Sequence, residues 1–310
     1  MRAGILILAL CASVSPSFAQ QISRDGDVER LVIAPGSDAK AWAAEEATMT
    51  SGPEYAKDGI ASLRFHVDVD YHAGEKEYPI GWPRASRPLT ESWRQDWSPF
   101  DFLRFWVYAT TSRERLPATP LGIVLYLSDL SEPSDKSSQS DKTVKPRKHE
   151  QSLPTPLKDQ WVQIEIPLWT IPHLGKVTRI QFFISESDYA DHDAIDFYIS
   201  DVSLVRYAAP RLQDLRVHPA VLFSNCGALI AEFRALGIAP DETVTGRLTL
   251  LADGREARRV AKPMKRGLNQ LVLDLGAANL PEGKYTVRAQ LGNGVAEERN
   301  VRIVASPWSD

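Results

Sequence analysis

The stretch Ser98–Ala109, SPFDFLRFWVYA, constrains the fold of this chain more than any other part of the sequence. With a period of two residues, it places apolar side chains on both faces of an extended strand. One face carries Leu103, Phe105 and Val107, and the other carries Phe102, Arg104, Trp106 and Tyr108. A strand that is apolar on both sides lies in the middle of a packed sheet, so this stretch predicts a central strand.

Several other segments share this strand-like character, and together they predict an all-β chain. The segments are Ile60–Tyr71, Leu121–Ser128, Trp161–Pro167, Thr178–Glu186 and Ile195–Arg206. We expect them to form one β-sandwich around the central strand. In Ile195–Arg206 the inward pattern slips by one residue at Ser200 and Asp201, which predicts a β-bulge there.

The amino terminus has the order of a secretory signal peptide. Residues 1–19 contain one arginine, an apolar run from Gly4 to Val14, Pro16 and a small residue at Ala19. Cleavage after Ala19 removes Arg2 and Cys11, which leaves Cys226 as the only cysteine and changes the net charge from −4 to −5. We therefore expect a secreted or periplasmic protein that contains no internal disulfide. No other apolar segment approaches the roughly 20 residues that span a bilayer, so we expect no membrane insertion.

The sequence also predicts where the domains divide. Residues 20–208 form the predicted first domain, and residues 131–156, rich in serine, lysine, aspartate and proline, are expected to be a mobile loop within it. After Ala208-Ala209-Pro210 a new rhythm of short strands and glycine turns runs over residues 210–306, which is typical of a smaller immunoglobulin-like sandwich. In that second domain, LPEGKY at Leu280–Tyr285 fits a corner where a tyrosine hydroxyl bonds back to the chain.

The run from Trp97 to Arg206 resembles the galactose-binding-domain-like jelly rolls of bacterial carbohydrate-binding modules. The residues that carry the resemblance are Asp101, Trp161, Ile166-Pro167-Leu168 and Phe197–Val202. The sequence departs from the family at Ser200, where these modules often have the first of two aspartates. The resemblance implies a sugar-binding role and a structural calcium near the closing strand, held in part by Asp201. No other cofactor is expected.

The first candidate site is an aromatic sheet face. Sugar recognition requires flat rings together with amides, carboxylates or arginine. If the middle strands are neighbours, their outward positions form such a face. Its members would be Trp106, Tyr108, Tyr126, Gln163 and Gln181. The alternative is that loops cover these side chains and the rings form a second layer of core.

A second candidate site is the aromatic loop between His72 and Pro99. It contains Tyr78, Trp82, Arg84 and Trp93, which would gather at one end of a jelly roll. The alternative is packing beneath a long loop. The acidic run Ser187–Ala194, with Glu186 before it, is a solvated turn or a place for a cation or sugar hydroxyls.

The sequence contains few signs of catalysis. It has no G-x-S-x-G, H-E-x-x-H or P-loop motif. A glycosidase would need two carboxylates across a cleft, and Glu75, Glu77, Glu165 and Glu186 are all possible. A polysaccharide lyase would need a tyrosine or histidine base beside an arginine, which Tyr71, His72, Tyr78 and Arg84 could supply.

These observations favour a secreted, non-catalytic protein that binds a polysaccharide or oligosaccharide. A lyase or glycoside hydrolase on the jelly roll is the first alternative, and a structural cell-surface module is the second. Nucleic acid is not an expected partner, because the net charge is −4 and we find no basic stripe or run interleaved with aromatic residues apart from the short KPRKH at Lys145–His149. Other secreted or cell-surface proteins are possible partners of the second domain.

Overall fold

The structure is a computed structural model that describes residues 22–72, 80–128, 147–153, 157–276 and 280–307. The predicted signal peptide lies outside these residues. The described part contains β-strands, turns and short 3-10 helices and no α-helix, as the sequence predicts for an all-β chain. It also contains no helix with the length and apolar character needed to cross a membrane. The 3-10 helices are η2 (Ala39–Ala41), η3 (Ser92–Arg94), η4 (Leu168–Thr170), η5 (Leu174–Lys176) and η6 (Glu186–Asp188).

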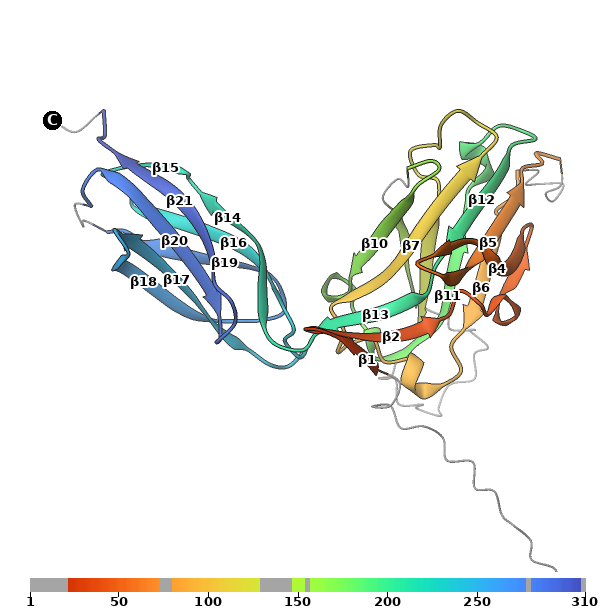
Figure 1. Ribbon diagram of the computed structural model, residues 1–310, viewed down its shortest axis with the longest axis horizontal. Helices are drawn as coiled ribbons and strands as arrows, with labels where there is room; N and C mark the ends of the chain where they lie inside the picture. Colours follow the sequence, from red (N-terminus) through yellow and green to blue (C-terminus); the bar gives the residue numbers. More distant parts are fainter. Residues whose placement is uncertain (1–21, 73–79, 129–146, 154–156, 277–279, 308–310) are drawn as a thin grey trace, which may run out of the picture.

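The strands form four sheets that enclose two separate hydrophobic cores, and Figure 1 shows the two sandwiches meeting where β13 runs into β14. Sheet 1 has the order β1-β2-β13-β7-β12-β5-β4, with β10 on the other edge of β7. Its strands are β1 (Ile22–Asp25), β2 (Val28–Ala34), β4 (Thr48–Lys57), β5 (Ile60–Asp68), β7 (Phe102–Thr111), β10 (Trp161–Pro167), β12 (Ala194–Ile199) and β13 (Val202–Tyr207). Sheet 2 has the order β3-β6-β11-β8-β9. Its strands are β3 (Ala43–Glu45), β6 (Arg84–Pro88), β8 (Gly122–Leu127), β9 (Arg147–Ser152) and β11 (Val177–Phe183).

Strand β7 is the centre of sheet 1, as its two apolar faces predict. It pairs with β10 along one edge, and with β12 and then β13 along the other. Its inward side chains meet those of sheet 2, where the ring of Phe105 lies edge-on to that of Phe182 at 5.5 Å. Each fully buried side chain of this size contributes about 1.5–3 kcal/mol to folding. The core between sheets 1 and 2 therefore holds the first sandwich together.

The predicted β-bulge is present between β12 and β13. Ile199 lies opposite Val107 and Ser203 opposite Arg104, so three residues on one side face two on the other. The bulge is anchored to β7 because the N–H of Ser200 donates to the carbonyl of Trp106 and the Ser200 hydroxyl accepts from the N–H of Trp106.

Two expectations for the first sandwich are corrected by the structure. The predicted loop 131–156 includes strand β9, which pairs with β8 from Leu127 opposite Arg147 to Gly122 opposite Ser152. Residues 131–146 and 154–156 of that loop lie outside the described residues. The aromatic loop between His72 and Pro99 includes strand β6. Both strands are short and polar, RASRP and RKHEQS, so even their inward positions lack the large apolar side chains that hydrophobic periodicity detects.

The second sandwich is built from two further sheets. Sheet 3 consists of β14 (Arg211–His218), β16 (Ala228–Leu236) and β19 (Gly267–Asp274). Sheet 4 has the order β15-β21-β20-β17-β18, with β15 (Val221–Phe223), β17 (Val244–Ala252), β18 (Arg255–Met264), β20 (Gly283–Leu291) and β21 (Glu297–Val304). The predicted tyrosine corner is confirmed, because the hydroxyl of Tyr285 donates to the carbonyl of Pro281 at 2.8 Å.

The two sandwiches contact each other through Asp101. This carboxylate is 1% exposed and accepts hydrogen bonds from the N–H groups of Tyr207 and Gly237. Beside it, Arg266 of the second sandwich donates to the carbonyl of Phe100 at 2.9 Å. The ring of Trp169 lies close against Gly267, where a Cβ atom would be only 2.7 Å from the indole.

Candidate functional site

The structure divides the predicted aromatic face between two sheets. Trp106 and Tyr108 on β7 and Gln163 on β10 lie on the outer face of sheet 1. Tyr126 on β8 and Gln181 on β11 lie on the outer face of sheet 2. The outer faces of a sandwich point in opposite directions, so the expectation of one continuous face was wrong. Alternation along a strand separates inward from outward side chains, but it does not say to which sheet a strand belongs.

The outer face of sheet 1 carries a cluster of four aromatic side chains, Tyr55, Tyr108, Trp161 and Tyr198, which we call the aromatic row. Tyr108 lies opposite Trp161 of β10 and opposite Tyr198 of β12, and neighbouring strands bring such side chains into contact. The ring of Tyr108 is 5.7 Å from that of Trp161 and 6.1 Å from that of Tyr198. The row therefore crosses the strands of the sheet.

Tyr55 reaches the row because of an irregularity in β4. Gly52 lies opposite Ser62 and Lys57 opposite Ile60, so five residue steps on β4 face two on β5, an excess of three residues. Within this bulge Tyr55 has a φ of 51°, in the left-handed region that is unfavourable for a bulky side chain. The bulge extends over sheet 1, where Lys57 places its ammonium group 4.6 Å from the ring centroid of Trp106.

The hydroxyl groups of the row differ from those of the other tyrosines. Within the described residues, the hydroxyls of Tyr55, Tyr108 and Tyr198 have no hydrogen-bond partner, although Tyr198 is only 4% exposed. The other described tyrosines, Tyr71, Tyr126, Tyr189, Tyr207 and Tyr285, all use their hydroxyls within the protein. Polar groups near the interior normally find partners, so the row is unusual in carrying three hydroxyls that the described part of the protein does not itself use.

Burial favours the protonated phenols of Tyr108 and Tyr198. It raises the pKa of Tyr108, and it raises the pKa of Tyr198 to about 12, with a further contribution from the nearby carboxylate of Asp196. At neutral pH both groups are therefore uncharged. A neutral phenol donates and accepts hydrogen bonds, but it is a poor proton acceptor for catalysis.

A charged network borders the row on β5 and β12. The guanidinium of Arg64 donates to both carboxylate oxygens of Asp196, at 2.7 and 3.0 Å, and this contact raises the pKa of Arg64. His66 Nδ1 lies 2.8 Å from the same carboxylate. Arg64 is thus neutralised by its neighbour, so it is not a free cation that could bind a uronate.

A polar cleft of about 360 Å³ opens beside the row, and Trp106 forms part of its lining. Gln163 lies opposite Trp106 in the sheet. Arg104, two residues before Trp106 on β7, lies opposite Glu165 and donates to it at 2.7 Å. The remaining walls come from the β1–β2 hairpin with Arg24 and Arg30, from the β4–β5 hairpin with Lys57 and Asp58, and from Asp201 in the bulge between β12 and β13. We call this the Trp106 cleft, and it combines one indole with several hydrogen-bonding groups.

On the outer face of sheet 2, the two predicted site residues bond to each other. The hydroxyl of Tyr126 donates to Gln181 Oε1 at 3.0 Å, and Ser86 donates to the same oxygen. Gln181 is 5% exposed, and the guanidinium of Arg179 lies 3.6 Å from the ring centroid of Tyr126. These groups have partners within the protein, so this face is the weaker candidate.

The predicted loop cluster does not gather in one place. Strand β6 separates Trp82 and Arg84 from Trp93, and Tyr78 lies outside the described residues. Trp82 is 43% exposed and stands edge-on to Phe183 on the outer face of sheet 2, where Arg84 pairs with Glu45. Trp93 packs against the first core beneath the guanidinium of Arg94. These residues form two separate packing contacts rather than one site.

Asp201, the predicted calcium ligand, holds protein groups together. One oxygen of its carboxylate accepts from the N–H of Gly36 at 2.8 Å, and the other lies 3.6 Å from the guanidinium of Arg30. It belongs to no group of three possible metal ligands in the described part of the chain. Calcium takes six to eight oxygen ligands, so these contacts alone do not form a calcium site.

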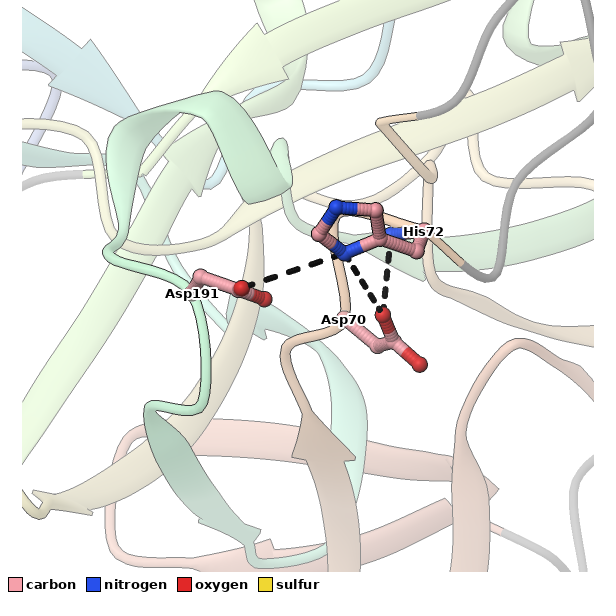
Figure 2. Close-up of side chains that lie close together, drawn as sticks. All are labelled: Asp70, His72 and Asp191. Carbon is pink, nitrogen blue, oxygen red and sulfur yellow. Dashed lines mark hydrogen bonds and ion pairs between the residues drawn. The ribbon is translucent and has the colours of Figure 1, made fainter.

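The described residues contain one group of three possible metal ligands, at a different place (Figure 2). Asp70, His72 and Asp191 bring their ligand atoms within 4.8 Å of one another. Asp191 accepts from the N–H of Tyr71, which lowers the pKa of Asp191, and Asp70 accepts from the N–H of His72. Both carboxylates thus stabilise the local turns, and the side chain of His72 is 83% exposed.

Comparison with known proteins does not place the chain in a family. No known protein family matches the sequence, and no curated protein matches it. Similar solved structures include a β-glucuronidase from Ruminococcus gnavus in complex with C6-substituted uronic isofagomine. Its sequence identity to this chain is 10% and the TM-score is 0.22, and the match covers 85% of this chain and 46% of that chain. The adhesin domain of Epf from Streptococcus pyogenes has 9% identity and a TM-score of 0.24 over 93% of this chain and 92% of that chain. The chain spans about half the length of the glucuronidase chain, and TM-scores this low carry no argument about function.

Three members of the row, Tyr55, Trp161 and Tyr198, are not among the predicted site residues. Trp161 shares the outward phase of Gln163 on its strand. Tyr198 alternates with the inward residues Phe197 and Ile199, so its outward phase was a usable signal. Tyr55 had no such signal, because its place depends on the three-residue bulge in β4.

Proposed function

We propose that this is a bacterial secreted or periplasmic protein that binds a polysaccharide or oligosaccharide without catalysis. The ligand lies on the aromatic row and extends into the Trp106 cleft. The first sandwich is then a galactose-binding-like jelly roll. The second is an immunoglobulin-like spacer that also offers a docking surface for other cell-surface proteins. The observation that carries the proposal is the set of unpartnered hydroxyls on the row, which contrasts with the bonded hydroxyls of every other described tyrosine.

The chemistry of the row suits a sugar. Aromatic rings pack against the C–H faces of pyranose units, and hydroxyl groups bond to the hydroxyls at their edges. Gln163 and Arg104 in the Trp106 cleft add an amide and a guanidinium to this surface. A purely structural role for the row is less well supported, because Tyr55 is 42% exposed and its ring packs on Tyr108 and Tyr198 rather than among the side chains of the first core cluster.

A polysaccharide lyase on the same face is less well supported than binding. Lyase chemistry requires a base whose pKa lies near the working pH and a cation that neutralises the uronate. Here the pKa values of Tyr108 and Tyr198 are raised, and Arg64 is paired with Asp196. Of the possible glycosidase carboxylates, Glu165 pairs with Arg104, and Glu186 is buried against the N–H of Gly81.

The proposal is tested by affinity electrophoresis in gels that contain hydroxyethylcellulose, xylan, laminarin, pectic galactan or dextran. We expect one or more of these polysaccharides to retard the wild-type protein, and Tyr108→Ala and Trp106→Ala to weaken the retardation about tenfold. Tyr126→Ala on the opposite face is the matched control and should bind like wild type. Melting curves of all variants separate lost binding from lost folding.

Each other result of this experiment has a definite meaning. New reducing or unsaturated ends would identify an enzyme and contradict the proposal. If Tyr126→Ala abolishes the retardation and Tyr108→Ala leaves it unchanged, the site lies on the outer face of sheet 2 instead. Neither retardation nor product would favour a structural module.

A further inference from the structure

Within the aromatic row, Tyr55 covers the two tyrosines below it. Its ring centroid lies 4.3 Å from that of Tyr198 and 4.8 Å from that of Tyr108, with interplanar angles of 34° and 37°. Carbon atoms in contact are about 3.5–4.0 Å apart, so a sugar ring between two aromatic rings needs about 7–8 Å. No sugar ring fits beneath Tyr55 as it stands. The ring of Tyr55 instead takes the place that a sugar would occupy on Tyr198.

The position of Tyr55 is held by few contacts. Its hydroxyl has no hydrogen-bond partner among the described residues, and the residue is 42% exposed. Its backbone is in the left-handed region, in a bulge whose pairing with β5 is interrupted. Such a conformation is unfavourable for a side chain with a Cβ atom. The two ring contacts, together with the bond from the Ser62 hydroxyl to the Tyr55 carbonyl, therefore hold the bulge against its own backbone preference.

We propose that Tyr55 is a displaceable cover that competes with the ligand for Tyr198 and Tyr108. This inference rests on the proposed function, because the competing ligand is the glycan. When a glycan binds, the ring of Tyr55 leaves the row, and a sugar ring replaces it on Tyr198. The apparent affinity is then reduced by the fraction of molecules in which the cover is closed. Removing the ring should strengthen binding, which is the opposite of what removal of a ligand-contacting aromatic does.

The test compares Tyr55→Asn with Tyr55→Phe. Asparagine tolerates left-handed backbone and removes the ring, whereas phenylalanine keeps the ring and the cover. Each ring contact is equivalent to about a two- to tenfold change in an equilibrium constant. In the gels that contain the five polysaccharides named above, we expect Tyr55→Asn to bind about two- to tenfold more tightly than wild type, and Tyr55→Phe to bind like wild type. Weaker binding by Tyr55→Asn would overturn the proposal, because Tyr55 would then contact the ligand directly. Unchanged binding would also overturn it, because Tyr55 would then not compete with the ligand.

A second measurement needs no ligand. Hydroxyl-radical footprinting with mass spectrometry reports the solvent access of each aromatic side chain. We expect Tyr198 to be modified faster in Tyr55→Asn than in wild type, while the buried Tyr189, whose hydroxyl bonds to Pro120, is unchanged. Equal modification of Tyr198 in both proteins would show that Tyr55 does not cover it.

The two measurements also separate this proposal from the proposed function. If Tyr108→Ala loses binding and Tyr55→Asn does not gain it, the glycan site stands and the cover is wrong. If no polysaccharide binds either protein, the proposed function fails and the competition fails with it, even if footprinting shows that Tyr55 shields Tyr198.

Discussion

The carboxylate of Asp101 in the first sandwich accepts a hydrogen bond from the backbone N–H of Gly237 in the second, at 3.1 and 3.2 Å from its two oxygens. Asp101 precedes the central strand β7, and Gly237 follows β16 with a φ of 67°. A Cβ atom at position 237 would lie 2.3 Å from the carbonyl oxygen of Ala209, so only glycine allows this approach. The central strand of one sandwich is thus tied directly to the other.

This contact predicts a pH dependence. Burial raises the pKa of Asp101 above its ordinary value of 3.8, so the folded protein holds this proton to higher pH than the unfolded chain does. The contribution of Asp101 to stability is fully present below its unfolded pKa and decreases as pH rises through its folded pKa. We therefore expect the stability advantage of wild type over Asp101→Asn to shrink as pH is raised from about 4 to 7. Urea unfolding of both proteins at each pH measures this difference, and an advantage that grows with pH would contradict it.

A fragment of residues 20–208 should fold without the second sandwich. Its core is separate from the second core, so burial within it is retained. It loses the partners of Asp101, Phe100 and Trp169 at the junction, and we expect cooperative melting at a lower temperature than that of the full chain. Thermal melting of the two proteins checks this. A fragment that is obtained only as an aggregate would show that the predicted boundary or its independence is wrong.

Removing single hydroxyls should distinguish ligand groups from structural ones. Tyr108→Phe removes a hydroxyl that has no partner in the described structure, so we expect stability within about 0.5 kcal/mol of wild type. If that hydroxyl bonds to a sugar, glycan binding weakens by about 0.5–1.5 kcal/mol. Tyr189→Phe is the matched control. It removes the hydrogen bond from the Tyr189 hydroxyl to the Pro120 carbonyl, so it should lower the free energy of unfolding by about 0.5–1.5 kcal/mol and leave glycan binding unchanged. Urea unfolding and affinity electrophoresis of both variants give the two readouts.

Residues 131–146 should be replaceable by a Gly-Ser turn. Leu127 and Arg147 are paired neighbours at the ends of β8 and β9, so a short turn can join them. The replaced residues are mostly polar, and the melting temperature should change by only a few degrees. Extending the deletion through Leu153 removes β9 and a side chain that is 3% exposed, so this second variant should be clearly less stable. Equal melting temperatures for the two variants would show that β9 contributes little.

Asp201 should stabilise the protein without calcium. Asp201→Ala removes the acceptor for the Gly36 N–H and the partner of Arg30, at a cost of about 1–3 kcal/mol. We expect the same loss in the presence of calcium and in the presence of a chelator, measured by urea unfolding. If chelation lowers the stability of wild type but not of Asp201→Ala, Asp201 binds a cation.

Much of the fold could be predicted from the sequence, because buried strands leave a strong pattern. Trp161–Pro167 was predicted with the bounds that the structure gives, and the slip at Ser200 and Asp201 correctly indicated the bulge. The edge strands β9 and β18 left no such pattern, because charged residues occupy about half of their positions and protect the open edges of the sheets.

The candidate site was only half predictable. Outward phase identified Trp106 and Gln163, which the structure confirms as neighbours. The same argument wrongly joined Tyr126 to them, because the partner of a strand is decided by the packing of the whole chain. Tyr55 is brought to the row by a bulge, and its left-handed backbone is a feature that no alternation pattern reports.

The extra residue at Ser200 and Asp201 lets one continuous stretch of chain perform two tasks that can vary separately. Before it, β12 presents Tyr198 on the outer face, and after it β13 keeps Val202 and Leu204 in the core and places Val205 opposite Phe102, near the second sandwich. If the chain continued in regular alternation from Ile195, with no bulge at Ser200 and Asp201, Val202 and Leu204 would point outward. Because the bulge resets this alternation, the outward position of Tyr198 and the inward positions of Val202 and Leu204 are set on separate strands. One strand thus contributes to the outer face of sheet 1 while the next leads to the junction with the second sandwich.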